Sequence, residues 1–429
     1  MLIQVVLALL LMLALALPVA GALYLIGLFV DIGFAPMPIR VTLGELTWNH
    51  GIDFTTVAVP FFILTGHLLL AAGVAERMYA AILRWVNWLP GGLMHANVVA
   101  CALFAATSGS SVATAATVGV VALPEIDRQK YNERLYLGSL AAGGTLGILI
   151  PPSINMVIYS VLTETSIPQL YLAGFIPGFL LAALFMVTIA VTCKIKPEWG
   201  GIRQRFTWKE RTRGLPDLIP VLMLFLVVVG SIYAGLATPT EAAGMGVVLA
   251  ALMAWKWKQL NFSVIFRATE STMKTVAMIM LIMVAAYFVN TGLAMVGFTD
   301  QVKQFVTGLG ISPLGTLLLI IGIYLMLGCI MEVLAMMLLT LPIVTPIIVH
   351  LGYNPVWFGI IIMLVCEMAQ LTPPVGLVSY VVQGIRKRGR VEDVFLGILP
   401  FVITMLAMCG LLIAFPQIAL WLPSQFYGK

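Results

Sequence analysis

Apolar residues run along the chain in long continuous blocks, separated by Gly, Pro and charged residues. A helix needs about 20 apolar residues to cross a bilayer, so blocks of this kind predict membrane segments. Continuous rather than alternating apolar runs favour helices over strands. The blocks span residues 2–17, 20–33, 52–73, 96–123, 135–162, 170–193, 216–236, 240–257, 272–292, 313–348, 356–382 and 394–416. We therefore predict an all-α polytopic membrane protein.

Four of these blocks are interrupted. Residues 96–123 and 313–348 carry small or polar residues at their centres, and we expect helix–turn–helix hairpins that enter and leave the membrane on the same side. Residues 135–162 and 356–382 contain Pro151-Pro152 and Pro373-Pro374. Adjacent prolines remove backbone donors and break a helix. Broken backbone at membrane depth is tolerated only where protein or a wet cavity covers it, so we expect re-entrant hairpins and broken helices.

The basic residues predict an orientation. Fifteen of the 23 Lys and Arg residues lie in three loops, at 194–217, 256–274 and 386–393. The positive-inside rule places these loops in the cytoplasm. The segments then alternate consistently if both hairpins are re-entrant and both termini are periplasmic. The first basic residue is Arg40, so residues 2–17 lack the basic start of a signal peptide and are expected to stay as a membrane segment.

Gly and Pro landmarks recur at an offset of about 223 residues, which indicates an internal repeat. The matched positions are Ala20-Gly21 with Ala243-Gly244, Gly73 with Gly297, Pro124 with Pro346, Pro151-Pro152 with Pro373-Pro374, and Pro177 with Pro400. Each half, 1–215 and 216–429, would hold scaffold helices, a hairpin and a broken helix. Five crossings and one hairpin per half would invert the second copy. Inverted repeats with broken helices are typical of secondary transporters.

The composition excludes several classes of protein. The chain is 61% apolar and 10% charged, with a mean hydropathy of +1.06, whereas a soluble domain is about 25% charged. This excludes a soluble enzyme and a nucleic-acid binder. Five dispersed cysteines and four histidines form no metal-binding spacing, and there is no P-loop or dinucleotide fingerprint. We therefore expect no enzymatic activity and no work driven by ATP bound to this chain.

The candidate chemistry lies at the interruptions. Thr107–Ser111 forms the centre of the first hairpin, where Gly109 permits a tight turn and helix ends offer N–H groups to a carboxylate and carbonyls to a cation. Gly143–Ser153, with three glycines and two prolines, is expected to be unwound, so that its free carbonyls could replace the hydration shell of Na⁺. Asn155 follows it, and Gln370 and Thr372 supply side-chain oxygens at the second break.

Two acids, Glu332 and Glu367, lie inside apolar segments. An ionisable residue within the membrane is a candidate functional residue, but a carboxylate can also cap a helix or accept a hydrogen bond from a hydroxyl, and both interpretations stay open. Glu241, in Thr238–Glu241, is more typical of a helix cap. Trp85, Asn87 and Trp88 suggest that residues 75–92 form an amphipathic arm at the membrane interface.

Several of these motifs together resemble the large membrane subunit of tripartite ATP-independent periplasmic (TRAP) transporters. They occur in the family order and cover nearly the whole chain. They are Thr107–Val118, Gly147–Tyr159 continuing to Gly178, Ala237–Ala242, Leu341–Pro346 and Leu371–Leu377. The resemblance implies an elevator-type subunit of a Na⁺-driven importer in the bacterial inner membrane. Its partners would be a small four-helix membrane subunit and a periplasmic binding protein that delivers an organic acid (a dicarboxylate, keto acid or sialic acid).

The resemblance also implies ion and substrate sites. One Na⁺ would bind between Ser108 and Ser110 of the first hairpin and Gly144, Gly147 and Pro151 of the first break. A second would bind between Gly328 to Glu332 of the second hairpin and Thr372 to Gly376 of the second break. The substrate would lie between the hairpin tips and contact Ser111, Asn155 or Thr372. Glu332 stands where the family often has Asp, and the resemblance implies that this difference alters ion or substrate preference.

The sequence alone also allows other functions. A self-sufficient ion-coupled carrier, or a channel with the same fold, would need no binding protein. An intramembrane serine protease would need a base for Ser110, but His67 and His95 lie at segment ends and there is no Gly-x-Ser-x-Gly motif.

Overall fold

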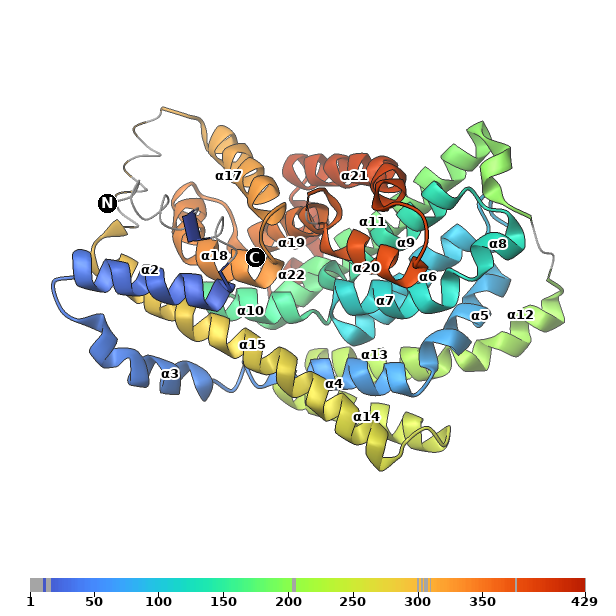
Figure 1. The fold of residues 1–429 in the computed structure, drawn as a ribbon, viewed down its shortest axis with the longest axis horizontal. Coiled ribbons are helices and arrows are strands. Elements are labelled where there is room, and N and C mark those ends of the chain that lie inside the picture. The colour runs from blue at the N-terminus through green and yellow to red at the C-terminus, as the bar shows by residue number, and fades with distance from the viewer. Residues whose placement is uncertain are drawn as a thin grey trace.

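The computed structural model describes residues 11–12, 17–202, 206–298, 301, 304, 308, 310–374 and 376–428 (Figure 1). These residues form helices and no strand. Four helices in this part are long and apolar enough to span a membrane, or up to seven if each bent pair counts as one span. The predicted all-α membrane fold is confirmed, whereas most of the predicted segment 2–17 lies outside the described residues.

The helices follow one another with short connections. The part up to the long basic loop contains α2 (Val19–Gly33), η1 (Ile39–Thr42), α3 (Leu43–Gly51), α4 (Ala58–Ala71), α5 (Val74–Val86), α6 (Leu93–Ser108), α7 (Ser111–Ala122), α8 (Glu125–Gln129), α9 (Glu133–Leu149), α10 (Ile154–Thr163) and α11 (Ile167–Ile195). After it come η2 (Pro197–Gly200), α12 (Trp208–Gly214), η3 (Leu215–Asp217), α13 (Ile219–Tyr233), α14 (Pro239–Lys256), α15 (Phe262–Met295), α17 (Pro313–Gly328), α18 (Val333–His350), α19 (Pro355–Leu371), α20 (Leu377–Arg386), α21 (Val391–Ala414) and α22 (Gln417–Tyr427).

The order of elements repeats along the chain. Helices α6 and α7 form a hairpin, α9 and α10 a broken helix, and α11 a long helix with Pro177 inside it. Helices α17 and α18, α19 and α20, and α21 with Pro400 follow in the same order. Both breaks fall at the Pro-Pro pairs, where the backbone donors are missing. The hairpins and breaks are therefore present where the sequence predicts them.

Local sequence explains how two helices begin. The Thr238 hydroxyl accepts a hydrogen bond from the backbone N–H of Glu241, and the Glu241 carboxylate accepts one from the backbone N–H of Thr238. This capping box at the start of α14 confirms the interpretation of Glu241. Helix α5, the predicted arm, begins after Gly73, which has φ +65°, and bends 72° away from α4. The arm is helical over a shorter range than predicted.

Helix α9 lies at the centre of the packing and crosses α21 without space for side chains. A Cβ on Gly138 would lie 2.0 Å from the carbonyl oxygen of Gly397, and a Cβ on Gly397 would lie 1.9 Å from that of Arg134. Nearby, the buried Arg386 at the end of α20 donates from Nε to Glu133 on α9 at 2.9 Å. Glycine at both positions therefore brings the two halves of the chain into backbone contact.

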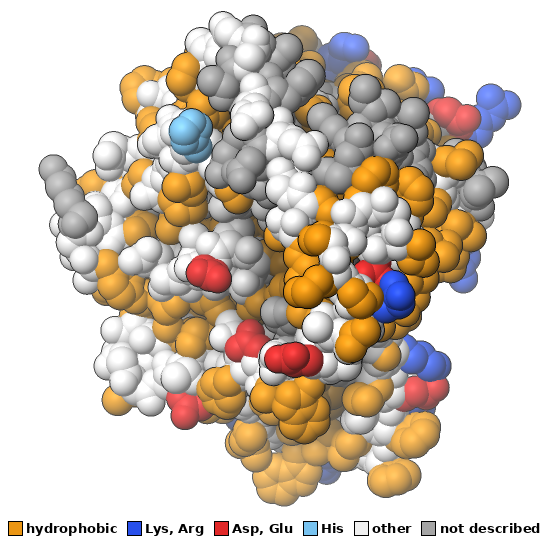
Figure 2. Space-filling model, turned by 90° about the vertical axis from the view of Figure 1, so that its left-hand side faces the viewer, with side chains coloured by type: hydrophobic (Ala, Val, Ile, Leu, Met, Phe, Trp, Pro, Cys, Tyr) orange, Lys and Arg blue, Asp and Glu red, His pale blue; other side chains and the backbone are white. Residues whose placement is uncertain are grey.

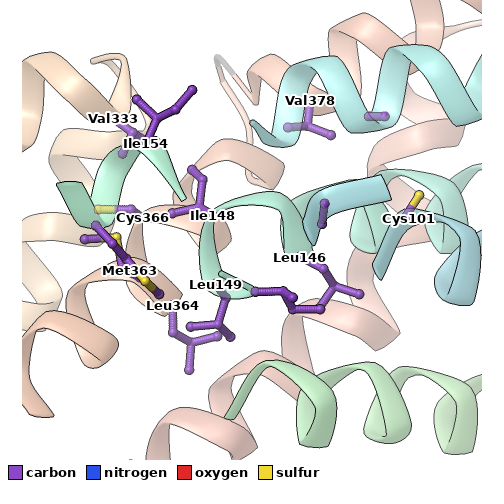
Figure 3. Close-up of a cluster of buried hydrophobic side chains, with 14 of the residues drawn as sticks. Cys101, Leu146, Ile148, Leu149, Ile154, Val333, Met363, Leu364, Cys366 and Val378 are labelled. Atoms are coloured by element: carbon purple, nitrogen blue, oxygen red, sulfur yellow. The ribbon is translucent and has the colours of Figure 1, made fainter. Parts of the chain in front are cut away.

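Apolar side chains fill the space around the first break (Figure 3). Leu149 at the end of α9 lies beside Met363 and Leu364 of α19, and Ile148 lies beside Cys366. Ile154 and Val333, the first residues of α10 and α18, lie close together in the same view. Residues of four helices, two from each half, thus belong to one buried cluster.

Charged residues are unevenly distributed over the surface. Figure 2, which looks at the left-hand end of Figure 1, shows Asp and Glu side chains spread over the near face, with Lys and Arg mostly towards one edge. Helix α12 and the end of α14, which belong to or border the basic segments 194–217 and 256–274, lie in the right-hand half of Figure 1.

Candidate functional site

The tip of the first hairpin is a tight turn rich in hydroxyl groups. Helix α6 ends at Ser108, Gly109 has φ +60°, and Ser110 caps α7 by accepting a hydrogen bond from the N–H of Ala113 at 3.4 Å. The hydroxyls of Ser108 and Thr114 lie 2.9 Å apart. Gly109 also accepts a hydrogen bond from the N–H of Ile154 across the first break, at 3.4 Å. The tip therefore contacts the broken helix directly.

The first break is shorter than predicted. Gly144 and Gly147 were expected in an unwound stretch, but they lie inside α9, which stays helical to Leu149. Only residues 150–153 leave the helix. A Cβ on Gly144 would lie 2.6 Å from the Cβ of Ala115, and one on Gly147 would lie 2.7 Å from the backbone N of Ser111. These glycines are explained by close packing of α9 against α7 rather than by unwinding.

Two carbonyl groups at the end of α9 nevertheless lack their helical donors. In an α-helix the carbonyls of Gly147 and Ile148 would accept from residues 151 and 152. Those residues are Pro151 and Pro152, which have no N–H group. Carbonyl and hydroxyl oxygens are suitable ligands for a hard cation such as Na⁺. The end of α9 and the adjacent hairpin tip therefore supply a donor set that fits a cation.

The second hairpin meets the second break in a similar way. A Cβ on Gly328 would lie 2.2 Å from the Cβ of Ala369, and the sulfur of Cys329 lies 3.6 Å from the Thr372 hydroxyl. Gly376 has φ +44°, and a Cβ added there would lie 3.0 Å from the carbonyl oxygen of Leu371 and 3.2 Å from that of Thr372. The structure thus brings together the segments expected to form the second ion site.

A cavity of about 510 Å³ lies between the two hairpins and the two broken helices. Five of the candidate residues line it: Ser108, Ser110, Ser111, Asn155 and Glu332. The other candidates are not among its lining residues: Gly144, Gly147, Pro151, Gly328, Thr372 and Gly376. Within the described part of the chain, no Lys or Arg side chain lines the cavity. Its polar surface is therefore made of hydroxyl, amide, imidazole and carboxyl groups.

Thr372 was a candidate for substrate contact, and the structure places a neighbouring residue there instead. The Thr372 hydroxyl donates to the carbonyl of Ala369 at 3.3 Å, whereas Gln370 lines the cavity. Gln370 is nearly buried, and its Oε1 has no hydrogen-bond partner among the described residues. A buried acceptor without a partner costs free energy, so this oxygen is available for a ligand.

The two intramembrane acids have different environments. Glu332 caps α18 by accepting a hydrogen bond from the N–H of Ala335 at 3.2 Å, and it also lines the cavity. Glu367 is fully buried behind the cavity wall. Its Oε1 accepts from the hydroxyl of Ser111 at 2.7 Å and from the N–H of Ile148 at 3.1 Å. The helix-capping and hydroxyl-bonding interpretations are therefore both observed, one for each acid.

Two polar residues of the cavity escaped the sequence interpretation. His67 on α4 and Thr275 on α15 line it opposite the hairpins. In the sequence, both residues lie in segments that have the composition of ordinary membrane helices. The only available signal was a polar residue within an apolar run, and that signal does not say which neighbour the residue faces. Their place in the site depends on how α4 and α15 pack.

Comparison with known proteins agrees with this geometry. Residues 6–418 match the family described as "Tripartite ATP-independent periplasmic transporter, DctM component". The C4-dicarboxylate TRAP transporter large permease protein DctM of Rhodobacter capsulatus is 35% identical, over 94% of this chain and 99% of the relative. The sialic acid TRAP transporter large permease protein SiaM of Vibrio cholerae is 33% identical, over 88% of each chain.

Two further matches concern chain length and fold. The isethionate TRAP transporter permease protein DctMQ of Oleidesulfovibrio alaskensis is 29% identical over 93% of this chain, which covers 62% of that relative. The solved structure of the YdaH transporter of Alcanivorax borkumensis has the same fold, with a TM-score of 0.60 at 17% identity over 88% of each chain. The named relatives are transporter permeases and not enzymes. The chain therefore belongs to the DctM component family, the large membrane permeases of TRAP transporters.

Proposed function

We propose that this chain is the conducting subunit of a Na⁺-coupled importer of an organic acid. The observation that supports this proposal best is the cavity at which both hairpins and both broken helices meet. Secondary transporters bind substrate and coupling ions at such interfaces between broken helices. The relatives named above carry C4-dicarboxylate, sialic acid and isethionate in their names, and all three are organic anions.

No Lys or Arg lines the described part of the cavity, and this suggests why substrate uptake would be coupled to Na⁺. Burying a carboxylate without a compensating charge is costly. Hydroxyl and amide donors from Ser111 and Asn155 would orient the substrate, and co-transported Na⁺ would supply the missing positive charge. The carbonyls of Gly147 and Ile148, together with the Ser108 and Ser110 hydroxyls, make a donor set for one Na⁺. The segments around Gly328, Glu332, Thr372 and Gly376 make a second.

The transport step would be an elevator movement of the elements that carry the hairpins. The Gly138–Gly397 crossing and the ion pairs of Arg386 hold α9, α20 and α21 together, which would let them move as one block. A scaffold for that movement would need a small four-helix subunit. The relative named DctMQ is longer than this chain, which is consistent with such a subunit in a fused form.

The remaining components would be a periplasmic binding protein that delivers the substrate, and a bacterial inner membrane in which both chain termini are periplasmic. The clustering of 15 basic residues in three loops supports this orientation. The substrate itself would be identified from the ligand bound to the binding protein.

The proposal can be tested by uptake into proteoliposomes that contain the two membrane subunits, with the binding protein outside. Uptake of the organic acid should need both an inward Na⁺ gradient and the binding protein. Flux that continues without either one would favour a self-sufficient carrier or a channel.

Two variants test the ion sites. Ser110→Ala and Thr372→Ala each remove one hydroxyl ligand, which is worth about 1.4 kcal/mol, so the Na⁺ concentration for half-maximal uptake should rise about tenfold. Ser110 also caps α7, so Ser110→Thr serves as the control that keeps both the cap and the hydroxyl. If both alanine variants keep the parental Na⁺ dependence, the proposed ion sites are wrong.

A further inference from the structure

A second hollow adjoins the central cavity. It is a groove of about 340 Å³ between α4 and α15, which pack side by side (Figure 1). His67 and Leu70 on α4 line both the groove and the cavity. The two hollows therefore adjoin at these two side chains.

One face of α15 is polar along the cavity and the groove. Arg267, Ser271 and Thr275 follow one another at intervals of four residues, so they lie on the same face of the helix. Thr275 lines the cavity, and Ser271 and Arg267 line the groove. A solute that leaves the cavity along α15 passes a hydroxyl, a second hydroxyl and then a guanidinium group.

The positive charge of Arg267 is not neutralised locally. Its Nη2 donates to the hydroxyl of Ser263 at 2.8 Å, and no acidic residue in the described part of the chain forms an ion pair with it. The nearby acid Glu270 instead pairs with Lys274 at 2.7 Å. Lys274 does not line the groove. Arg267 is thus the cationic side chain that lines the groove, and it lies within residues 256–274, which the positive-inside rule predicts to be cytoplasmic.

We propose that this groove is the cytoplasmic release route of the transported anion, and that Arg267 is its anion-binding residue. The inference rests on the proposed import of an organic acid. Arg267 is exposed at the groove, and its charge raises the local concentration of anions there. Arg267 therefore attracts the anion once it has left the cavity, whose described wall holds no Lys or Arg. In the reverse direction it collects anions from the cytoplasm.

The test measures the half-saturating substrate concentration at the cytoplasmic face separately from that at the periplasmic face. Proteoliposomes with the two membrane subunits are loaded with increasing concentrations of a substrate that the parent protein transports, and exchange against external substrate is followed. In Arg267→Gln the internal half-saturating concentration should rise about tenfold. Its Na⁺ dependence and its external half-saturation with the binding protein should stay unchanged. Arg267→Lys, which keeps the charge, should stay near the parental value.

Lys274→Gln is the matched control, because it removes the same charge from the same helix without touching the groove. Equal internal half-saturation in Arg267→Gln and Lys274→Gln would overturn the proposal. If the parent protein itself takes up no organic acid under an inward Na⁺ gradient, the proposed function fails as well. If the parent is active and Arg267→Gln behaves like the parent, only the release route fails.

A labelling experiment gives an independent measurement. Ser271→Cys places a thiol in the groove, and an impermeant thiol reagent is added from the cytoplasmic side with the parent protein as background. Substrate on that side should slow labelling of Ser271→Cys severalfold and leave labelling of Lys274→Cys unaffected. Equal labelling with and without substrate, or labelling from the periplasmic side alone, would contradict the proposed route.

Discussion

Ser111 Oγ, at the start of α7, donates a hydrogen bond to Glu367 Oε1 on α19 at 2.7 Å, across 256 positions of sequence. The same oxygen accepts from the N–H of Ile148 at 3.1 Å. One carboxyl oxygen from the second half of the chain thus holds the first hairpin and the end of α9. Two of the elements expected to bind the first Na⁺ are aligned by a residue that does not line the cavity.

Removing this carboxyl should destabilise the protein. Glu367→Ala removes the acceptor of the 2.7 Å bond from Ser111, whose hydroxyl keeps only the Thr145 carbonyl at 3.4 Å, and it removes the side-chain acceptor of the Ile148 N–H. The free energy of unfolding should therefore fall by about 2 kcal/mol. Glu367→Gln keeps an acceptor oxygen and should cost about 1 kcal/mol. Thermal unfolding of the purified variants in detergent measures both effects. A double-mutant cycle with Ser111→Ala should give a coupling of about 1 kcal/mol. Additive effects would show that the two side chains act independently.

Gly147→Ala should separate α9 from the first hairpin. The added Cβ would lie 2.7 Å from the backbone of Ser110 and Ser111, which cannot move aside as a flexible side chain would. We expect a loss of about 2 kcal/mol in stability together with a loss of uptake. Gly230→Ala is the control, because a Cβ there meets no atom within 4 Å. Near-parental stability and uptake in Gly147→Ala would mean that the close packing is not required.

Asn155→Ala should affect substrate and not Na⁺. Asn155 lines the cavity at the start of α10, and its amide can donate to a carboxylate. Losing a hydrogen bond to a charged group costs about 1.5 kcal/mol or more, so the substrate concentration for half-maximal uptake should rise at least about tenfold. Uptake titrated separately with substrate and with Na⁺ distinguishes the two. A change confined to the Na⁺ titration would assign Asn155 to an ion site instead.

Arg386→Met should be far more damaging than removal of an exposed ion pair. The Arg386 side chain is 4% exposed and pairs with Glu133 at 2.9 Å and Asp393 at 3.4 Å. The two acids are 35% and 25% exposed, and they keep Arg388 and Arg134 as partners. We therefore expect a loss of about 2 kcal/mol, which is below the cost of breaking a fully buried pair. Lys274→Met, which removes the exposed Lys274–Glu270 pair, should cost less than about 0.5 kcal/mol. Chemical denaturation of both variants gives the comparison, and equal losses would contradict the expected effect of burial.

The hairpins and breaks were predictable because their signals are local. Pro151-Pro152 and Pro373-Pro374 cannot continue a helix whatever surrounds them. Gly109 between serines marks a turn in the same way. The capping box of Thr238 and Glu241 is also contained in four residues. Each of these interpretations required only residues that are close in sequence.

The predictions that differ from the structure depend on packing between segments that are distant in sequence. Gly144 and Gly147 have the composition of an unwound stretch, and only the approach of α7 explains why they are helical glycines. The positions of Gln370 in the cavity and Thr372 outside it follow from the rotation of α19, which the sequence does not determine. His67 lines the cavity because α4 packs opposite the hairpins. Contacts of this kind have no signature in neighbouring residues.

The crossing of Gly138 and Gly397 has a consequence for how the chain can be divided. The two polypeptide backbones touch there, and any larger residue at either position would force the helices apart. A fragment that ended near residue 215 would expose this surface and would leave the polar groups held by Glu367 without their acceptor. We expect the two repeats to melt in a single transition, and separately expressed halves to become soluble in detergent only when they are produced together.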